Sequence, residues 1–354
     1  MFDLHMLPAR HGDALWIEYG DPARPHRILI DGGPRSRSTT GMLKELLTGS
    51  GDSAPTLELI VVTHIDADHI SGILRLLEDD DLPIETRDLW FNGWDHLPSD
   101  LLGAKQAESL TSAITSRGLN WNDDFDGAAV MVPDDGPLPR VRLPGDMSLT
   151  LLGPSRTDLA ALRPVWKREV EDAGLIPGYG AREPIEQPDV LGDRPLDVVA
   201  LSEEPFEADH SEANGASIAF IAEHDDRRLL ATGDAHAATL ESGLQRLADE
   251  EGVDRIRVDV VKLPHHGSKY NLSRELLHAV DCDRFLFSTN GAIYRHPDPT
   301  TVARILVDRN DPELVFNYRK ATTERWDSSR LRRRHGYRTI YPDDTEGQGV
   351  LVTI

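Results

Sequence analysis

The sequence has little cysteine, little positive charge and no long apolar run. Its 354 residues include one cysteine, Cys282, so no disulfide can form within the chain and nothing points to an oxidising compartment. No stretch approaches the roughly 18 apolar residues that a membrane-spanning helix needs, and no charged and apolar leader precedes Phe2. We therefore expect a soluble, cytoplasmic protein that does not associate with membranes, with Cys282 buried beside a strand.

Positive charge is scarce because 38 Lys and Arg stand against 61 Asp and Glu, which gives a formal net charge of -23. Such a balance works against unassisted binding to nucleic acid or anionic membranes. A phosphate-bearing substrate would need a local basic patch or bound cations. The dense basic cluster at residues 330–335 (RLRRRH) is a candidate for gripping phosphates, and equally for an exposed helix end.

Short apolar runs rich in β-branched residues recur along the chain, and polar or Gly-rich residues close each of them, which is typical of buried strands. The predicted strands cover residues 14–19, 27–30, 57–62, 217–222, 228–231, 257–263 and 284–288. Helical spacing is found at 70–77, 272–280 and 299–307. Asp225 and Asp226 predict a hairpin turn between two strands. The mixture predicts sheets covered by helices.

Two stretches carry few strand signals. Residues of about 80–140 are acidic and aromatic in patches, and residues 154–215 are rich in Pro, Gly and acids. We expect both to be insertions or long loops within a single domain that spans residues 1–354. They would form the rim of a pocket, where specificity often lies on loops, or engage a protein partner.

The stretch VVTHIDADHI, residues 61–70, places two histidines and two aspartates within six positions behind an apolar run. A buried strand that ends just before His64 and a helix that begins near His69 would bring these side chains together at the carboxyl end of a strand. Architectures that mix strands and helices place their chemistry there. A lone histidine beside a strand is more often structural, but four potential ligands so close together favour a metal site.

Other predicted strands end in a similar way. Apolar runs lead into Asp-Gly-Gly at 31–33, into Thr-Gly-Asp-Ala at 232–235 and into Pro-His-His-Gly-Ser at 264–268. Each delivers a carboxylate or an imidazole beside small residues that let backbones approach closely. Each ending is ordinary by itself, and the repetition predicts one site built from several strand ends.

The order DGG, THxDxDH, TGDA, HHGS resembles the metallo-β-lactamase fold. More narrowly, it is similar to the metallo-β-lactamase-like domain of the competence DNA-uptake proteins and to free-standing relatives of that domain. In that group the second motif histidine of the wider superfamily is an aspartate, as Asp66 is here. Residues 10–14 (RHGDA) and 288–297, with N-x-Y-x-HP, strengthen the match, which spans roughly residues 3–77 and 214–307. The resemblance implies an α+β fold, an αββα sandwich of two mixed sheets with helices outside.

The resemblance also implies a centre for two divalent ions, zinc or manganese. Its candidate metal ligands are His64, Asp66, Asp68, His69, Asp234, His265 and His266. The first two would belong to one ion, Asp68 and His69 to the other, and Asp234 would bridge them. One histidine of the pair 265–266 would complete the second site, and we expect His266 to be the ligand and His265 to face substrate.

The wider superfamily supplies a further histidine just before the strand predicted at 217, where this chain has Asn214. Asn214 or the more distant His210 could stand in for it. Asp31 could orient a ligating imidazole, or simply hold its own turn before two glycines.

The candidate catalytic residues are Asp68, His265 and His296. The last lies in the segment that matches the N-x-Y-x-HP motif, and it is a candidate for contact with substrate. Lys262, Lys269 and Arg295 could line the pocket mouth and hold an anion, although a solvated position is the commoner one for a lysine.

The implied function is that of a metal-dependent hydrolase. Bound dications lower the pKa of a water from ~15.7 toward ~7 and so supply hydroxide at neutral pH. With Asp66 in place of an imidazole, the ligand set shifts preference toward manganese without excluding zinc. A phosphodiester is the leading substrate, either a small or nucleotide-type molecule or single-stranded nucleic acid, because the DNA-uptake relatives are thought to degrade a DNA strand.

Two alternatives stay open at this point. The bond could be an ester, lactone or amide, as elsewhere in the superfamily. The chain could also be a non-catalytic binding or scaffold protein that keeps the fold.

Overall fold

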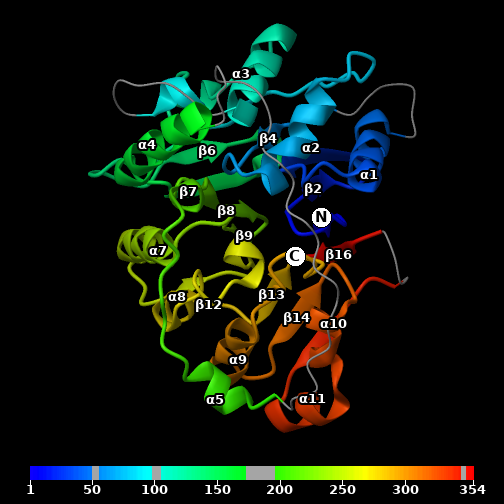
Figure 1. Ribbon diagram of the computed structural model, residues 1–354, viewed down its shortest axis with the longest axis vertical. Coiled ribbons are helices and arrows are strands. Elements are labelled where there is room, and N and C mark those ends of the chain that lie inside the picture. Colours follow the sequence, from blue (N-terminus) through cyan, green and yellow to red (C-terminus); the bar gives the residue numbers. More distant parts are fainter. Residues whose placement is uncertain (50–55, 98–104, 173–195, 344–347) are drawn as a thin grey trace.

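The computed structural model describes residues 1–49, 56–97, 105–172, 196–343 and 348–354. It shows two mixed sheets with helices around them, as the sequence predicted (Figure 1). The described part of the chain contains no helix that is both long enough and apolar enough to cross a membrane. Cys282 is buried, as expected.

The first sheet has six strands in the order β16-β1-β2-β3-β4-β5. Their bounds are β1 Phe2–Met6, β2 Leu15–Asp21, β3 Arg24–Ile30, β4 Leu59–Val61, β5 Leu89–Trp90 and β16 Val350–Thr353. Strands β3, β4 and β5 run parallel, whereas β16, β1, β2 and β3 alternate in direction. The first and last strands of the chain therefore lie side by side (Figure 1).

The second sheet has eight strands in the order β15-β14-β13-β11-β9-β8-β7-β6. Their bounds are β6 Arg140–Arg142, β7 Ser148–Gly153, β8 Ala219–His224, β9 Arg227–Ala231, β11 Val260–Lys262, β13 Arg284–Phe287, β14 Glu313–Phe316 and β15 Arg338–Ile340. From β6 to β9 the strands are antiparallel, and from β9 to β15 they are parallel. Asp225 and Asp226, both with positive φ, form the predicted hairpin turn.

The helices are α1 Arg37–Thr48, α2 Ala67–Leu77, α3 Lys105–Arg117, α4 Arg156–Asp172, α5 Val198–Ser202, α6 Glu212–Gly215, α7 Ala237–Glu251, α8 Arg274–Ala279, α9 Pro299–Asp308, α10 Ala321–Glu324 and α11 Ser329–His335. The helical patterns predicted at 70–77, 272–280 and 299–307 correspond to α2, α8 and α9.

Two apolar clusters hold the layers together. In the larger one, Ile17 and Ile28 of the first sheet pack with Phe220 and Leu230 of the second sheet. The smaller one joins the first sheet to α1, α2 and α3, which lie together at the top of Figure 1. Burial of these faces removes apolar surface from water and so stabilises the sandwich.

The strand predicted over 257–263 is wrong in one respect, because it is two strands. Ile256–Arg257, strand β10, pairs with β12, Val280–Asp281, in a separate small sheet, and β11 begins only at Val260. Periodicity could not show the break, because the strands with which the two pieces pair lie far along the chain.

The two stretches expected to be insertions or long loops contain regular elements. Residues 80–140 carry β5, which extends the first sheet, and α3, which packs against α2. Residues 154–215 carry α4, α5 and α6, and residues 173–195 lie outside the described residues.

Helix α2 approaches the Asp-Gly-Gly turn so closely that two glycines are needed at the contact. A methyl group at Gly72 would lie 1.9 Å from the carbonyl oxygen of Gly32. Gly41, inside α1, has no atom within 4 Å of the corresponding position. We expect Gly72→Ala to lower the free energy of unfolding by about 1–3 kcal/mol through overpacking. Gly41→Ala should instead raise it by about 0.5–1 kcal/mol. Urea unfolding of both variants checks this, and equal effects would contradict the close approach.

Candidate metal centre

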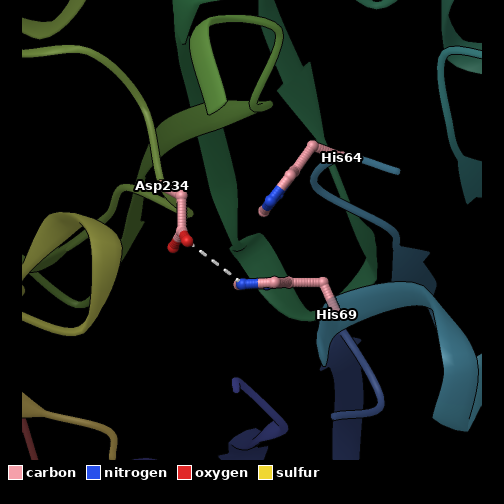
Figure 2. Close-up of side chains that lie close together, drawn as sticks. All are labelled: His64, His69 and Asp234. Carbon is pink, nitrogen blue, oxygen red and sulfur yellow. Dashed lines mark ion pairs between the residues drawn. The ribbon is translucent and has the colours of Figure 1, made fainter. Parts of the chain in front are cut away.

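The candidate side chains lie where strands of both sheets end. His64 follows β4, Asp68 and His69 lie in the first turn of α2, Asp234 follows β9 and His266 follows β11. Figure 2 shows His64 and His69 on one side and Asp234 facing them from the other. The centre is therefore built from two sheets rather than from one.

The donor atoms of these residues come close together. The Oδ2 atom of Asp234 lies 3.3 Å from Nε2 of His69 and 3.4 Å from Nε2 of His266. The Oδ2 atom of Asp68 lies 3.5 Å from Nε2 of His266. The ring centres of His64 and His69 are 4.2 Å apart.

Each of the three imidazoles is fixed through its other nitrogen. Nδ1 of His69 lies 2.8 Å from Oδ2 of Asp31, and Nδ1 of His266 lies 2.9 Å from the carbonyl oxygen of Ser288. Both partners can only accept, so both Nδ1 atoms donate. The hydroxyl of Thr63 already donates to Asp31 at 2.7 Å, so at 3.0 Å it accepts from Nδ1 of His64. In the neutral form of each ring the lone pair therefore lies on Nε2, where it can bind an ion.

The donor atoms that face the centre lack hydrogen bonds. Nε2 of His64, His69 and His266 and Oδ1 of Asp234 are buried without a hydrogen bond. A buried polar atom left unsatisfied costs about 1–3 kcal/mol, so four of them together call for an explanation such as an ion. Among the described residues, donor atoms of His64, His69 and Asp234 lie within 4.8 Å of one another, as do those of Asp68, His69 and His266. The residues thus fit divalent metal.

The charges of the cluster favour a cation. Burial alone lowers the pKa of His69, but the carboxylates of Asp234 and Asp31 raise it well above its ordinary value. Burial alone raises the pKa of Asp234, but His266 and His69 hold it well below its ordinary value. Without metal, the buried carboxylates therefore favour the protonated forms of His69 and His266, and a bound dication would replace that positive charge.

The prediction for Lys262 at a pocket mouth is wrong, because its side chain is fully buried. Its ammonium group contacts Oδ2 of Asp13. Burial alone would raise the pKa of Asp13, but Lys262 and His266 lower it, so the pair is ionic. Sequence reasoning noted Asp13 only as part of a turn motif and missed its place in the centre. Its neighbours come from a distant strand, which a sequence pattern cannot show.

His265 lies at the exposed side of the centre. Its side chain is 24% exposed, and its Nε2 atom is 4.0 Å from Oδ2 of Asp234. Nδ1 faces Oδ1 of Asn271 at 3.0 Å and Oδ2 of Asp209 at 3.3 Å. The expected stand-in Asn214 is buried and donates to Asp209 at 2.6 Å. Asp209 and Asn271 were missed by the sequence analysis, and no motif marks them.

Three other candidates lie further from the shared donor atoms. Asp66, with a side chain 42% exposed, has its Oδ2 atom 3.6 Å from Nε2 of His64. His210 is exposed. His296 is buried, with its ring centre 5.4 Å from that of His265. Burial lowers the pKa of His296, so this imidazole is neutral at pH 7.

A family model for the metallo-β-lactamase superfamily matches residues 23–289 of the chain. No curated protein matches this chain. Similar solved structures include Zn²⁺-bound PqqB from Methylobacterium extorquens, with 13% identity, a TM-score of 0.42 and 100% of both chains covered. A mutant of the CmlA β-hydroxylase shows 12% identity and a TM-score of 0.40. The alignment with CmlA covers 100% of this chain and 54% of the CmlA chain.

The placement of the two histidines 69 and 210 gives a direct test. We expect His69→Ala to lose bound metal, because Nε2 of His69 faces the shared donor atoms. His210→Ala should keep the wild-type metal content, because His210 is exposed. Elemental analysis after loading with Mn²⁺ or Zn²⁺ and dialysis measures both. Equal loss in the two variants would contradict the centre as described.

Proposed function

We propose that this chain, which belongs to the metallo-β-lactamase superfamily, is a hydrolase with two divalent ions, zinc or manganese, and acts on a phosphodiester. The observation that carries the proposal is the set of buried donor atoms without hydrogen bonds, contributed by both sheets. A non-catalytic scaffold would have no need to keep them unsatisfied.

The chain's own residues would hold the ions in two overlapping groups. His64, His69 and Asp234 form one group. Asp68, His69 and His266 form the other, so His69 belongs to both. Bound ions supply a water of lowered pKa and offset the negative charge of the substrate. The hydrogen bonds that the Nδ1 atoms donate turn the rings and select the neutral tautomer whose Nε2 atom can bind an ion.

His265 would bind substrate beside the ions. It is partly exposed, and Asn271 and Asp209 hold its ring through Nδ1. His296 stands next to it, with a pKa that burial lowers. Burial alone lowers the pKa of His265, but the carboxylates of Asp234 and Asp209 raise it above its ordinary value. His265 would therefore be the more readily protonated of the two imidazoles.

A small phosphodiester suits the distribution of positive charge better than long nucleic acid does. The arginine-rich helix α11 lies at the end of the molecule opposite to α2 (Figure 1). Arg332 of that helix lies 3.5 Å from the carboxylate of Asp327. The basic cluster is therefore remote from the centre, and bound cations would have to offset most of the charge of a phosphate.

We expect hydrolysis of bis-p-nitrophenyl phosphate with added Mn²⁺ or Zn²⁺, and none after removal of metal by a chelator. Asp234→Ala should abolish turnover while the protein stays folded, because it removes the carboxylate whose Oδ2 atom lies close to the Nε2 atoms of both His69 and His266. Asp68→Ala should do the same. Measurement combines the release of p-nitrophenol with circular dichroism.

The control replaces Arg333 and Arg334 of α11 by Gln, because both are exposed and remote from the centre. This double variant should turn over the small substrate as the wild type does. Hydrolysis of carboxylic esters or lactones without any hydrolysis of phosphodiesters would shift the assignment to that class of bond. Full activity of both aspartate variants would refute the site itself.

A further inference from the structure

Behind the centre lies a continuous chain of buried charges. The ammonium group of Lys262 contacts Asp13, lies 3.9 Å from Oδ1 of Asp234 and donates to the carbonyl oxygen of Gly233 at 3.3 Å. Both Lys262 and Asp13 are almost completely buried. Neither Lys262 nor Asp13 is among the residues that we have assigned as metal ligands or as substrate contacts.

The carboxylate of Asp13 faces a ligand with its second oxygen. Oδ1 lies 3.4 Å from Nδ1 of His266, the nitrogen that donates to Ser288. This oxygen has no hydrogen bond of its own. Asp13 therefore stands between Lys262 and the back of the His266 ring.

The two oxygens of Asp234 have different surroundings as a result. Oδ2 faces the Nε2 atoms of His69 and His266 at 3.3 and 3.4 Å. Oδ1 faces the ammonium group of Lys262. The positive charge gives the carboxylate a preferred orientation, since a buried charge interacts strongly with its neighbours in a medium of low dielectric constant.

We propose that Lys262 and Asp13 are positioning residues of the metal centre, which orient Asp234 and His266 toward the ions. This inference rests on the proposed function and deepens it. The pair also connects the two sheets, because Asp13 precedes β2 of the first sheet and Lys262 ends β11 of the second. A shift of one sheet against the other would separate the ligands, and the pair opposes that shift.

Stability alone does not account for the pair. A buried ion pair often adds little over apolar side chains of the same size, because both charges lose their hydration. At this place the ion pair instead holds Asp234 and His266, two ligands that come from different loops. Partners that contact metal ligands in this way typically change metal affinity by about 10–100-fold when they are removed.

The test uses the full chain and Mn²⁺ as the probe. Two variants are compared with the wild type: Asp13→Asn, which keeps the shape of the side chain, and Asp13→Asn with Lys262→Met, which removes both charges together. We expect the affinity for Mn²⁺ to fall about 10–100-fold in both. The electron paramagnetic resonance signal of paired Mn²⁺ ions should weaken in both. Thermal unfolding reports whether each variant is folded.

The matched control removes another ion pair, Arg87 with Asp124, whose closest atoms lie 2.7 Å apart. Arg87→Met with Asp124→Asn should lower the unfolding temperature and leave Mn²⁺ binding unchanged. Wild-type affinity in the folded Asp13 variants would overturn the positioning role and leave the proposed function intact. If the double variant does not fold, Asp13→Asn alone decides. A wild-type protein that binds no Mn²⁺ or Zn²⁺ would overturn the proposed function and this inference with it.

Discussion

The constraint on which the centre depends is the burial of carboxylates in excess of buried positive charge. Asp13, Asp31 and Asp234 are almost completely buried, and Lys262 is the ammonium group among them. Isolated charges of this kind are costly to remove from water unless they are paired. Protonated imidazoles can supply the missing positive charge, and so can divalent ions. The hydrogen bonds, the orientation of the rings and the chemistry of the site all follow from this balance.

The packing of two sheets face to face brings charged residues of both sheets together at the metal centre, where their charges can balance. Ligands from the first sheet arrive through the loop after β4 and the first turn of α2, whose position depends on the close contact between Gly32 and Gly72. Ligands from the second sheet arrive through the loops after β9 and β11. Packing of the two sheets around Ile17, Ile28 and Phe220 fixes the distance between the sets. Fold stability and the geometry of the centre are therefore linked.

The hydrogen bonds around the centre orient two kinds of histidine, the proposed metal ligands and His265, which we assign to substrate. Asp31 and the carbonyl group of Ser288 fix ligating imidazoles from behind, whereas Asp209 and Asn271 fix His265, which faces outward. The same type of contact, an acceptor at Nδ1, thus serves both the residues that we propose as metal ligands and the residue that we assign to substrate. The two kinds of histidine differ in burial. The Nε2 atoms of His69 and His266 are buried, whereas the side chain of His265 is partly exposed.

The sequence by itself indicated the strands that lead into the centre, the polar residues at their ends and the candidate donor atoms, because apolar periodicity and the spacing of motifs are local properties. It did not indicate strands such as β1, β7, β14 and β16. From it, His64, His69, Asp234 and His266 could be named before any coordinates were known. The tertiary structure alone decided that Lys262 is buried, that Asp13 stands behind His266 and that Asp209 holds His265. It also placed the arginines of α11 away from the centre. These facts depend on which residue of one sheet meets which residue of the other, and no spacing along the chain encodes that pairing.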